Sequence, residues 1–356
     1  MENNDFVLLH QRLLEWYDCH QRHLPWRARP GQHPNPYHVL LSEIMLQQTT
    51  VSTVIDYFNR FTERWPTLKT LAHATEEELY HQWQGLGYYS RARNLHACVK
   101  RLVHDCGGQI PQSPEALLQL PGIGPYTAAA IAAIAYDFPI VPVDGNITRV
   151  IARIASLQTP LPALKEEVCK VLSPLRPTRA GDFAQALMDL GATICKPKQP
   201  RCDLCPLTAS CLSYQTNQQH TIPRTTPKPL KPTRYTFAFW CENKDGDVLL
   251  ARRPKTGVLA NLVGLPTSDW VNDPAELPPI LPQWRRVPKP VKHTFTHFHL
   301  IIDCFIVKDL QISDTFKDHP DNFHCYPIPT LMKKVINACL ASRNALPGLF
   351  EQLNAG

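Results

Sequence analysis

The sequence predicts two domains, an all-α domain followed by an α+β domain. Its 356 residues exceed what one hydrophobic core usually supports. Apolar residues recur at three- and four-residue steps from Phe6 to about Leu212, which is the spacing of helices. After residue 234 the chain carries short β-type runs separated by turn signals. We therefore expect one domain over residues 1–220 and a second over 234–356, joined by a linker at 221–233.

The first domain is expected to consist of helices with prolines between them. A further helix should begin near Tyr126, directly after the turn LPGIGP. The segment TIPRTTPKPLKPTR then concentrates four prolines among basic residues, a composition that favours extended chain, so it is the predicted linker. The clearest helical runs are residues 6–17, 37–49, 51–61, 94–103 and 183–194.

The second domain should combine strands with a last helix over 331–340, LMKKVINACL. Runs rich in β-branched and aromatic residues predict the strands. They cover residues 235–240, 247–253, 293–307 and 324–328.

Composition and charge narrow the classes of function. A net charge of +6 suits a polyanionic partner, although many basic proteins never bind one. The opening residues MENNDFVLLH do not match the pattern of a signal peptide, and no apolar run reaches the roughly 20 residues that span a bilayer. We therefore expect a cytoplasmic protein without a membrane segment. In that reducing compartment, clustered cysteines indicate metal or redox chemistry rather than disulfides.

Four cysteines form such a cluster at the end of the helical half. The stretch CKPKQPRCDLCPLTASC has the spacing C-x6-C-x2-C-x5-C. Four thiolates in one short loop predict a metal site, because a metal offsets the crowding of ionisable sulfurs. Zinc and iron–sulfur clusters both accept four cysteines, but the wide first gap differs from the paired C-x2-C pattern of zinc sites and favours iron–sulfur. The predicted ligands are Cys195, Cys202, Cys205 and Cys211.

The stretch LPGIGPYTAAAIA predicts a phosphate-binding turn. Gly122 and Gly124 allow a tight turn and close approach, and the helix that follows offers unpaired N–H groups at its positive end. About twenty residues later Asp144 precedes another helix, where an Asp often serves only as an N-cap. Glu43 lies between apolar residues at helical spacing, so burial should raise its pKa. A protonated acid with an ionised carboxylate is the pair that cleaves glycosidic bonds.

These segments together resemble the helix-hairpin-helix DNA glycosylases that carry an iron–sulfur cluster, and within them the MutY-type adenine glycosylases. The resemblance rests on LPGIGPYTA, VPVDGNITRV, SEIMLQQT, GLGYYSRARNL and the cysteine spacing, and covers essentially the whole chain. It implies two helical subdomains, one with the hairpin and one formed by the N-terminal helix and the cluster region. It also implies a monomeric enzyme with a [4Fe–4S] cluster, which acts on double-stranded DNA containing adenine:8-oxoguanine or adenine:guanine mispairs and associates with the nucleoid through that DNA.

The resemblance also implies roles for individual residues. Glu43 would protonate the adenine leaving group, Asp144 would stabilise or trap the sugar cation, and Tyr126 and Asn146 would support that intermediate. Tyr126 stands where lyase relatives carry a Schiff-base lysine, so strand cleavage through an imine is not expected. The residues expected to contact DNA around the flipped adenine are Gln48, Thr49, Leu86, Tyr88, Gly122 and Gly124.

The second domain resembles the Nudix fold through LLARRPKTGVLANLVGLP. The segment after Pro266 lacks the glutamate-rich R-E-x-x-E-E helix that holds magnesium, so pyrophosphatase activity is not expected. The segment VKHTFTHFHL matches the family's loop for sensing 8-oxoguanine, with Phe295-Thr296-His297 in place of the usual Phe-Ser-His.

Two other functions remain open from the residues alone. One is an endonuclease III-like pyrimidine glycosylase with lyase activity, which Tyr126 and the extra domain disfavour. The other is a zinc-stabilised DNA-binding module, in which Glu43 and Asp144 would be structural.

Overall fold

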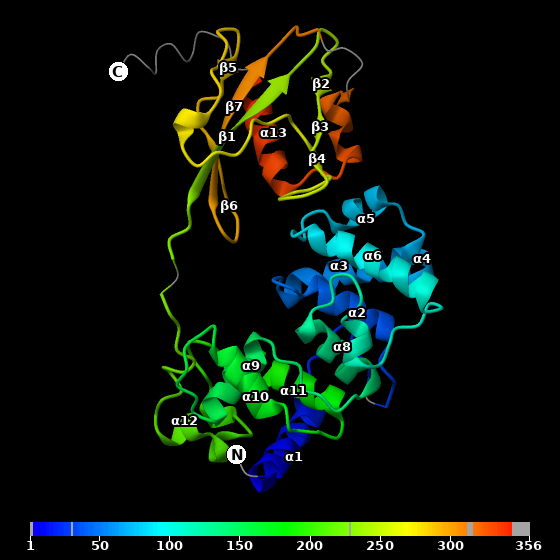
Figure 1. The fold of residues 1–356 in the computed structure, drawn as a ribbon, viewed down its shortest axis with the longest axis vertical. Coiled ribbons are helices and arrows are strands. Elements are labelled where there is room, and N and C mark those ends of the chain that lie inside the picture. The colour runs from blue at the N-terminus through cyan, green and yellow to red at the C-terminus, as the bar shows by residue number, and fades with distance from the viewer. Residues whose placement is uncertain (1–2, 30, 228, 312–315, 344–356) are drawn as a thin grey trace. The chain divides into compact units, whose positions relative to one another are not determined.

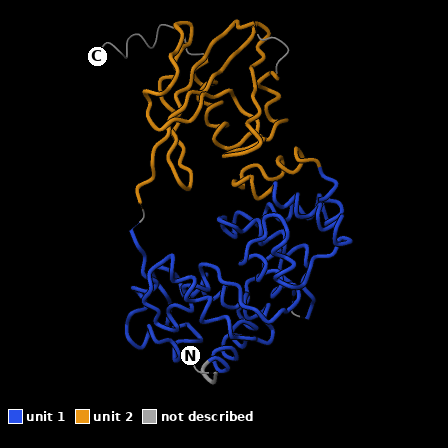
Figure 2. Tube along the Cα trace, in the orientation of Figure 1, with its two compact units in different colours: residues 1–74, 93–228 blue, residues 75–92, 229–356 orange. Residues whose placement is uncertain are grey.

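The computed structural model describes residues 3–29, 31–227, 229–311 and 316–343 (Figure 1). By contacts the chain divides into two compact units (Figure 2). Unit 1 comprises residues 1–74 and 93–228, and unit 2 comprises 75–92 and 229–356. The described part of unit 1 is helical, and unit 2 combines helices with a sheet, so the predicted fold class is confirmed. No helix among the described residues is long and apolar enough to cross a membrane.

Unit 1 is built from α-helices and two short 3₁₀ turns. Helix α6 runs across the boundary between the units at residues 92 and 93. The elements are α1 (Asn3–His20), α2 (Pro36–Met45), α3 (Val51–Arg64), α4 (Leu68–Ala72), α6 (Ser90–Asp105), α7 (Pro114–Leu117), α8 (Pro125–Tyr136), α9 (Gly145–Ile154), α10 (Leu164–Leu172), α11 (Ala180–Thr193), η1 (Cys202–Leu204), η2 (Thr208–Ser210) and α12 (Leu212–Gln215).

One hydrophobic core of unit 1 joins the N-terminal helix to the segments around the cysteines. Leu13 of α1 packs in the same buried cluster as Ile147 of α9, Val168 of α10 and Phe183 of α11. Helix α11 also contacts α8, so it lies between the hairpin helix and the core that α1 completes. Ile222, within the predicted linker, is buried in this core too.

Unit 2 contains a four-stranded sheet with β7 at its centre. Strand β7 (His299–Val307) pairs in parallel with β1 (Thr233–Cys241), and antiparallel with β5 (Arg285–Arg286) and β6 (Val291–Thr294). Helix α13 (Thr330–Arg343) packs on this sheet through Leu331, Val335 and Cys339. The other elements are α5 (Glu76–Trp83), β2 (Val248–Leu249), β3 (Ala251–Arg252), β4 (Val263–Gly264), η3 (Pro274–Glu276), β8 (Lys317–Asp318) and η4 (Pro320–Cys325).

Three strand predictions need correction. The run 247–253 is not one strand, because it divides at Leu250 into β2 and β3, which pair with different strands. Residues 324–328 were expected to be extended in a strand, but the chain there forms the end of η4 and then an irregular segment, because His319 caps a 3₁₀ turn that Pro320 begins. The run 293–307 is not one strand: it includes the end of β6, a turn and β7. Phe295-Thr296-His297 lies in that turn, where successive side chains do not point to opposite faces of a sheet as they do in a strand.

The segment 75–92 is attached to unit 2 by side-chain hydrogen bonds. Gln84 Nε2 donates to the carbonyl of Ile328 at 2.7 Å, and His81 Nε2 lies 2.5 Å from the carbonyl oxygen of Cys325. The domain boundaries predicted from the sequence, at 1–220, 221–233 and 234–356, stay a prediction.

Candidate active site and cysteine pocket

Glu43 lies on α2, a helix that is buried on most of its surface. Asn35 caps the helix, with its side chain accepting from the N–H groups of Tyr37 and His38, and Pro36 occupies the first turn. The Glu43 side chain is 6% exposed, as the sequence predicts. Burial raises its pKa to about 7, while a hydrogen bond from Tyr126 and the charge of Arg27 act in the opposite direction. Glu43 can therefore carry a proton near neutral pH.

Tyr126 is in the first turn of α8, immediately after the predicted hairpin turn. Gly122 has φ 77°, and a Cβ there would lie 2.6 Å from Asn94 Cβ, so this position requires glycine. Gly124 is the N-cap, and a Cβ on it would meet nothing within 4 Å. Burial and the neighbouring carboxyls of Glu43 and Asp144 raise the pKa of Tyr126, so its hydroxyl stays protonated and donates to Glu43.

Asp144 is the N-cap of α9, so the capping interpretation of this residue is confirmed. Its Oδ1 accepts from the Ile147 N–H at 2.6 Å, and its Oδ2 accepts from Asn146 Nδ2 at 3.0 Å. Burial raises the pKa of Asp144, and these hydrogen bonds partly offset that effect. Because Asp144 perturbs the pKa of both Glu43 and Tyr126, unit 1 brings three predicted catalytic groups close enough to interact electrostatically.

A hydrogen-bonded chain that the sequence did not reveal links Asp144 to Cys195. Arg149 Nη2 donates to Asn146 Oδ1 at 2.9 Å, and Arg149 Nε donates to the carbonyl of Cys195 at 2.8 Å. A second Arg149 bond, Nη2 to Gly191 O at 2.7 Å, ties α9 to α11. Arg149 lies five residues after Asp144 in the segment VDGNITRV, but spacing alone does not indicate which carbonyl groups a guanidinium meets.

Asp189 is a second buried acid that the sequence analysis missed. It is fully buried on α11 and accepts from Arg22 Nε at 2.6 Å and from Arg27 Nη1 and Nη2 at 2.6 and 2.7 Å. Burial would raise its pKa, but the two arginines outweigh burial and lower it. The signal was available in ALMDLGA, where an acid stands among apolar residues as Glu43 does. Since Arg27 also perturbs Glu43, this ion-pair group borders the candidate site.

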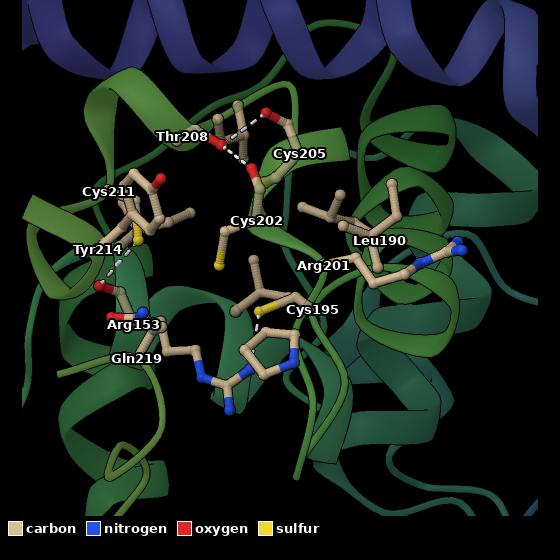
Figure 3. Close-up of a pocket in the computed structure, with 15 residues that line it drawn as sticks. Arg153, Leu190, Cys195, Arg201, Cys202, Cys205, Thr208, Cys211, Tyr214 and Gln219 are labelled. Atoms are coloured by element: carbon tan, nitrogen blue, oxygen red, sulfur yellow. Dashed lines mark hydrogen bonds between the residues drawn. The ribbon is translucent and has the colours of Figure 1, made fainter. Parts of the chain in front are cut away.

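The four predicted metal ligands line one pocket of unit 1. The thiols of Cys195, Cys202 and Cys211 face a common space in Figure 3. Among the described residues, no three His, Cys, Asp or Glu side chains converge closely enough to hold a single metal ion. Burial raises the pKa of Cys202 and Cys211, and raises that of Cys205 to about 11. Without a bound cation the thiols of Cys202, Cys205 and Cys211 would therefore stay protonated.

Arg153 brings a buried positive charge to this pocket. It is 1% exposed, and its Nη1 donates to Cys195 Sγ at 3.2 Å and to Lys196 O at 2.8 Å (Figure 3). Its Nη2 and Nε donate to the carbonyls of Pro197 and Ile222. No carboxylate pairs with it among the described residues. A buried cation without an anionic side chain favours an anionic group in the pocket.

Several predicted DNA contacts lie in unit 2. The Tyr88 hydroxyl is 2.6 Å from Thr296 Oγ1. Tyr88 is 45% exposed and its backbone has φ 48°, whereas Leu86 is buried. Phe295 is half-buried on the unit's core, and Thr296 and His297 are exposed. In unit 1, Gln48 is exposed at the end of α2 with φ 57°, and Thr49 Oγ1 donates to Gln47 O at 3.4 Å.

Comparisons with known proteins find similarity over both halves of the chain. Residues 41–174 match the family described as HhH-GPD superfamily base excision DNA repair protein, and residues 237–338 match the NUDIX domain family. The Nudix-like prediction is thus confirmed.

Three relatives named adenine DNA glycosylase illustrate the range of coverage. The human protein is 33% identical over an alignment of 395 positions, covering 91% of this chain and 72% of its own length. The protein of Buchnera aphidicola is 31% identical, covering 93% of this chain and 96% of its own length. The rat protein is 44% identical over 222 residues, which are 59% of this chain. The chain spans less than half of the length of the rat and mouse relatives, 42% and 43%.

Solved structures resemble the helical part. A thermostable thymine-DNA glycosylase superposes with a TM-score of 0.52 and 29% identity, covering 60% of this chain and 98% of its own. A trapped endonuclease III–DNA intermediate superposes with a TM-score of 0.50 and 21% identity, covering 61% of this chain and 99% of its own, and shares the fold.

Proposed function

Because the chain belongs to the MutY-type adenine DNA glycosylase family, we propose that it hydrolyses the N-glycosidic bond of adenine mispaired with 8-oxoguanine, or with guanine, in double-stranded DNA. The observation that carries this proposal is the buried Glu43, whose pKa is raised to about 7 beside Tyr126 and Asp144. Adenine is a poor leaving group as an anion, so a positioned acid near neutral pH is the group that the reaction needs.

In the proposed reaction, adenine leaves the helix stack and enters the site in unit 1. Glu43 protonates the base, and the bond between the sugar and the base then breaks. The Asp144 carboxylate, which accepts from Ile147 and Asn146, stabilises or covalently traps the sugar cation until water completes the hydrolysis. Tyr126 donates to Glu43 and orients it. Asn146 orients Asp144 and is itself held by Arg149.

We propose that the enzyme is monofunctional. Forming an imine with the sugar requires an amine, and the residue at the mouth of α8 is Tyr126, whose raised pKa keeps it a neutral phenol. The product strand should therefore break only after alkali.

For DNA binding we propose three sets of contacts. The N–H groups at the start of α8, after Gly122 and Gly124, bind a phosphate, and open space where a Gly124 Cβ would lie permits close approach. The second set consists of contacts from Gln48 and Thr49 of unit 1 and, separately, from Leu86 and Tyr88 of unit 2. Phe295-Thr296-His297 contacts the opposing 8-oxoguanine. We infer further that the protein acts as a cytoplasmic monomer on nucleoid DNA.

We also propose that Cys195, Cys202, Cys205 and Cys211 hold a [4Fe–4S] cluster. The four cysteines line one pocket, and partly buried thiols beside the Arg153 guanidinium suit an anionic group. When bound, the cluster would fix the loop after Cys195, where Lys196, Lys198 and Arg201 are exposed to DNA phosphates.

The proposed activity is tested by single-turnover excision from a duplex with one adenine:8-oxoguanine pair, with and without alkali. Glu43→Gln and Asp144→Asn should each retain duplex binding and lose most excision. Two variants serve as matched controls and should retain excision. Glu15→Gln changes an exposed glutamate of α1, and Asp273→Asn changes another N-cap aspartate, which accepts from Ala275 N–H at 2.9 Å. Parental turnover by Glu43→Gln or Asp144→Asn would rule out the assigned role of that residue.

Monofunctionality and the cluster have their own readouts. Borohydride trapping of a covalent complex at the level of a true lyase would contradict the role of Tyr126.

Metal analysis should find four irons per chain, whereas one zinc and no iron would overturn the cluster and favour a zinc-stabilised module.

A further inference from the structure

The turn between β6 and β7, which carries Phe295-Thr296-His297, has a well-fixed backbone. The Phe295 N–H donates to the Phe298 carbonyl at 2.8 Å, and Thr294 pairs with His299 at the ends of the two strands. The ammonium of Lys231 donates to the Phe295 carbonyl at 3.1 Å. The turn is therefore closed by backbone bonds and held from outside by Lys231.

The Phe295 ring is half-buried against other rings of unit 2. Its centroid lies 4.6 Å from that of His293, 4.8 Å from Phe298 and 5.7 Å from Trp270. Trp270 precedes Val271, whose N–H and C=O pair with Tyr235 of β1 at 3.0 and 2.9 Å. Trp270, on which Phe295 packs, is thus attached to the main sheet.

Two guanidinium groups flank these rings. The Cζ atom of Arg253 lies 4.7 Å from the centroid of Trp270, and that of Arg234 lies 4.7 Å from the centroid of Phe298. Arg253 is itself held by Val258 O at 3.2 Å and Thr267 Oγ1 at 3.4 Å. We name Arg253, Trp270, Phe295, Phe298 and Arg234 the aromatic stack. Cation–π contacts at both ends favour a single arrangement of the rings.

Packing, rather than hydrogen bonding, holds Trp270 in this stack. Its indole Nε1 is buried, and it has no hydrogen-bond partner in the described part of the chain. A buried donor without a partner costs free energy, so a tryptophan here contributes through the area of its ring. A phenylalanine at this position would keep an aromatic face and remove the unpaired N–H.

We propose that Trp270, backed by Arg253, is a positioning residue for discrimination of the base opposite adenine. The ring of Trp270 sets the location of Phe295, and Phe295 sets the directions in which Thr296 and His297 leave the turn. This inference rests on the proposed contact between that turn and 8-oxoguanine. In this role Trp270 takes no part in the chemical step.

The test compares single-turnover excision from adenine:8-oxoguanine and adenine:guanine duplexes, with binding measured on both. Trp270→Ala and Trp270→Leu should each lower the preference for adenine:8-oxoguanine about tenfold, because the Phe295 ring loses the aromatic face on which it packs and no longer aligns Thr296 and His297. The rate on adenine:guanine at saturating enzyme should stay within about twofold of the parent. Trp270→Phe, which keeps an aromatic ring, should keep the parental preference for adenine:8-oxoguanine.

Trp284→Ala is the matched control. Trp284 is also a half-buried tryptophan of unit 2, and its ring packs edge-on against Phe239, with centroids 5.0 Å apart, rather than against the rings of the turn. It should keep the parental preference. If Trp270→Ala melts below the assay temperature, Trp270→Leu decides, because leucine fills most of the volume without an aromatic face.

The double variant Thr296→Ala/His297→Ala separates the two levels of the argument. If it lowers the preference while folded Trp270→Leu does not, the positioning role of Trp270 is overturned and the lesion-sensing turn remains. If neither lowers it, the assignment of 8-oxoguanine recognition to this turn fails. A preference lost equally in Trp270→Phe and Trp270→Leu would also overturn the positioning role, since an aromatic ring would then not be what is required.

Discussion

Glu43 and Asp189 are both buried acids of unit 1, yet their pKa values move in opposite directions. Burial raises the pKa of Glu43 to about 7, because one phenol hydrogen bond and the more distant charge of Arg27 do not compensate for lost hydration. Asp189 loses hydration as well, but Arg22 and Arg27 bond it directly and lower its pKa. Direct ion pairing thus separates a carboxyl group that can donate a proton from one that holds the structure together.

Glu43→Gln should make the protein more stable at alkaline pH. The folded pKa of about 7 lies above the usual 4.5, so the folded state holds a proton that the unfolded state releases, and stability falls as the pH rises through that interval. Glutamine imitates the protonated acid and avoids this loss. The gain in free energy of unfolding should be on the order of 3 kcal/mol at pH 8 and close to zero at pH 4.

Urea unfolding at pH 4, 6 and 8 measures this difference. Glu15→Gln, on an exposed position, should show no such dependence on pH. If the stability difference between Glu43→Gln and the parent stayed constant with pH, the raised pKa of Glu43 would be excluded.

Arg153→Leu should weaken retention of the proposed cluster. The change removes the donor to Cys195 Sγ and leaves the carbonyls of Lys196, Pro197 and Ile222 without their bonds inside the protein. Iron per chain should fall to less than about half of the parent after purification, since each buried acceptor left without its bond costs about 1–3 kcal/mol. Iron content and visible absorption are the measurements. Arg176→Leu, an exposed arginine outside the pocket, should retain full iron.

At the scale of elements, α11 positions the helices that carry the candidate catalytic groups. A Cβ on Gly191 would lie 2.6 Å from Asn146 Cβ of α9, and a Cβ on Gly181 would lie 2.7 Å from the Ala133 carbonyl of α8. Small residues on one helix therefore allow both α8 and α9 to approach closely. The separation of α9 from α11 determines where Asp144 and Asn146 lie.

Gly191→Ala should destabilise the protein and lower excision. The new methyl group clashes with the side chain and backbone of Asn146, and overpacking of this kind costs about 1–3 kcal/mol. Displacement of Asn146 also removes a donor from Asp144, so excision should fall more than DNA binding does. Thermal unfolding and single-turnover excision measure the two effects.

Gly145→Ala is the matched control for stability. Gly145 begins α9, its Cβ would meet nothing within 4 Å, and its φ is not positive, so its unfolding free energy should change by less than about 1 kcal/mol. Equal destabilisation by the two substitutions would show that the approach of α9 to α11 is not tight at Gly191.

At the scale of the whole molecule, the affinity from phosphate contacts should depend strongly on salt concentration, whereas discrimination between mispairs should not. The chain carries a net charge of +6, and Lys196, Lys198 and Arg201 are exposed in the loop after Cys195. Phosphate contacts release counterions, so they should govern affinity for all duplexes alike, whereas the turn at Phe295-Thr296-His297 should govern only discrimination.

Lys198→Ala should reduce the slope of log binding constant against log salt by about one for both mispairs, and should leave their ratio unchanged. Lys333→Ala, an exposed lysine of α13, is the control and should leave the slope as it is. Binding titrations at four salt concentrations measure the slope. An unchanged slope for Lys198→Ala would place the loop after Cys195 away from DNA.

The sequence by itself determined the features that depend on neighbouring residues. Helical spacing, turn glycines, capping residues and clustered cysteines act within a few residues of one another, so they predicted both classes of domain, the buried Glu43, the Asp144 cap and the four pocket cysteines. Local signals failed where the chain turns or divides, as at 324–328, within 293–307 and within 247–253.

Only the tertiary structure decided which distant groups meet. Asp189 finds Arg27 across 162 residues of chain, Arg153 reaches Cys195 across 42, and Phe295 packs on Trp270 from a separate segment. A guanidinium or a ring has the same local preferences whichever partner it meets, so sequence spacing leaves the partner open. Chain closure and burial select it, because an unpaired charge inside the protein costs far more free energy than the same charge in water.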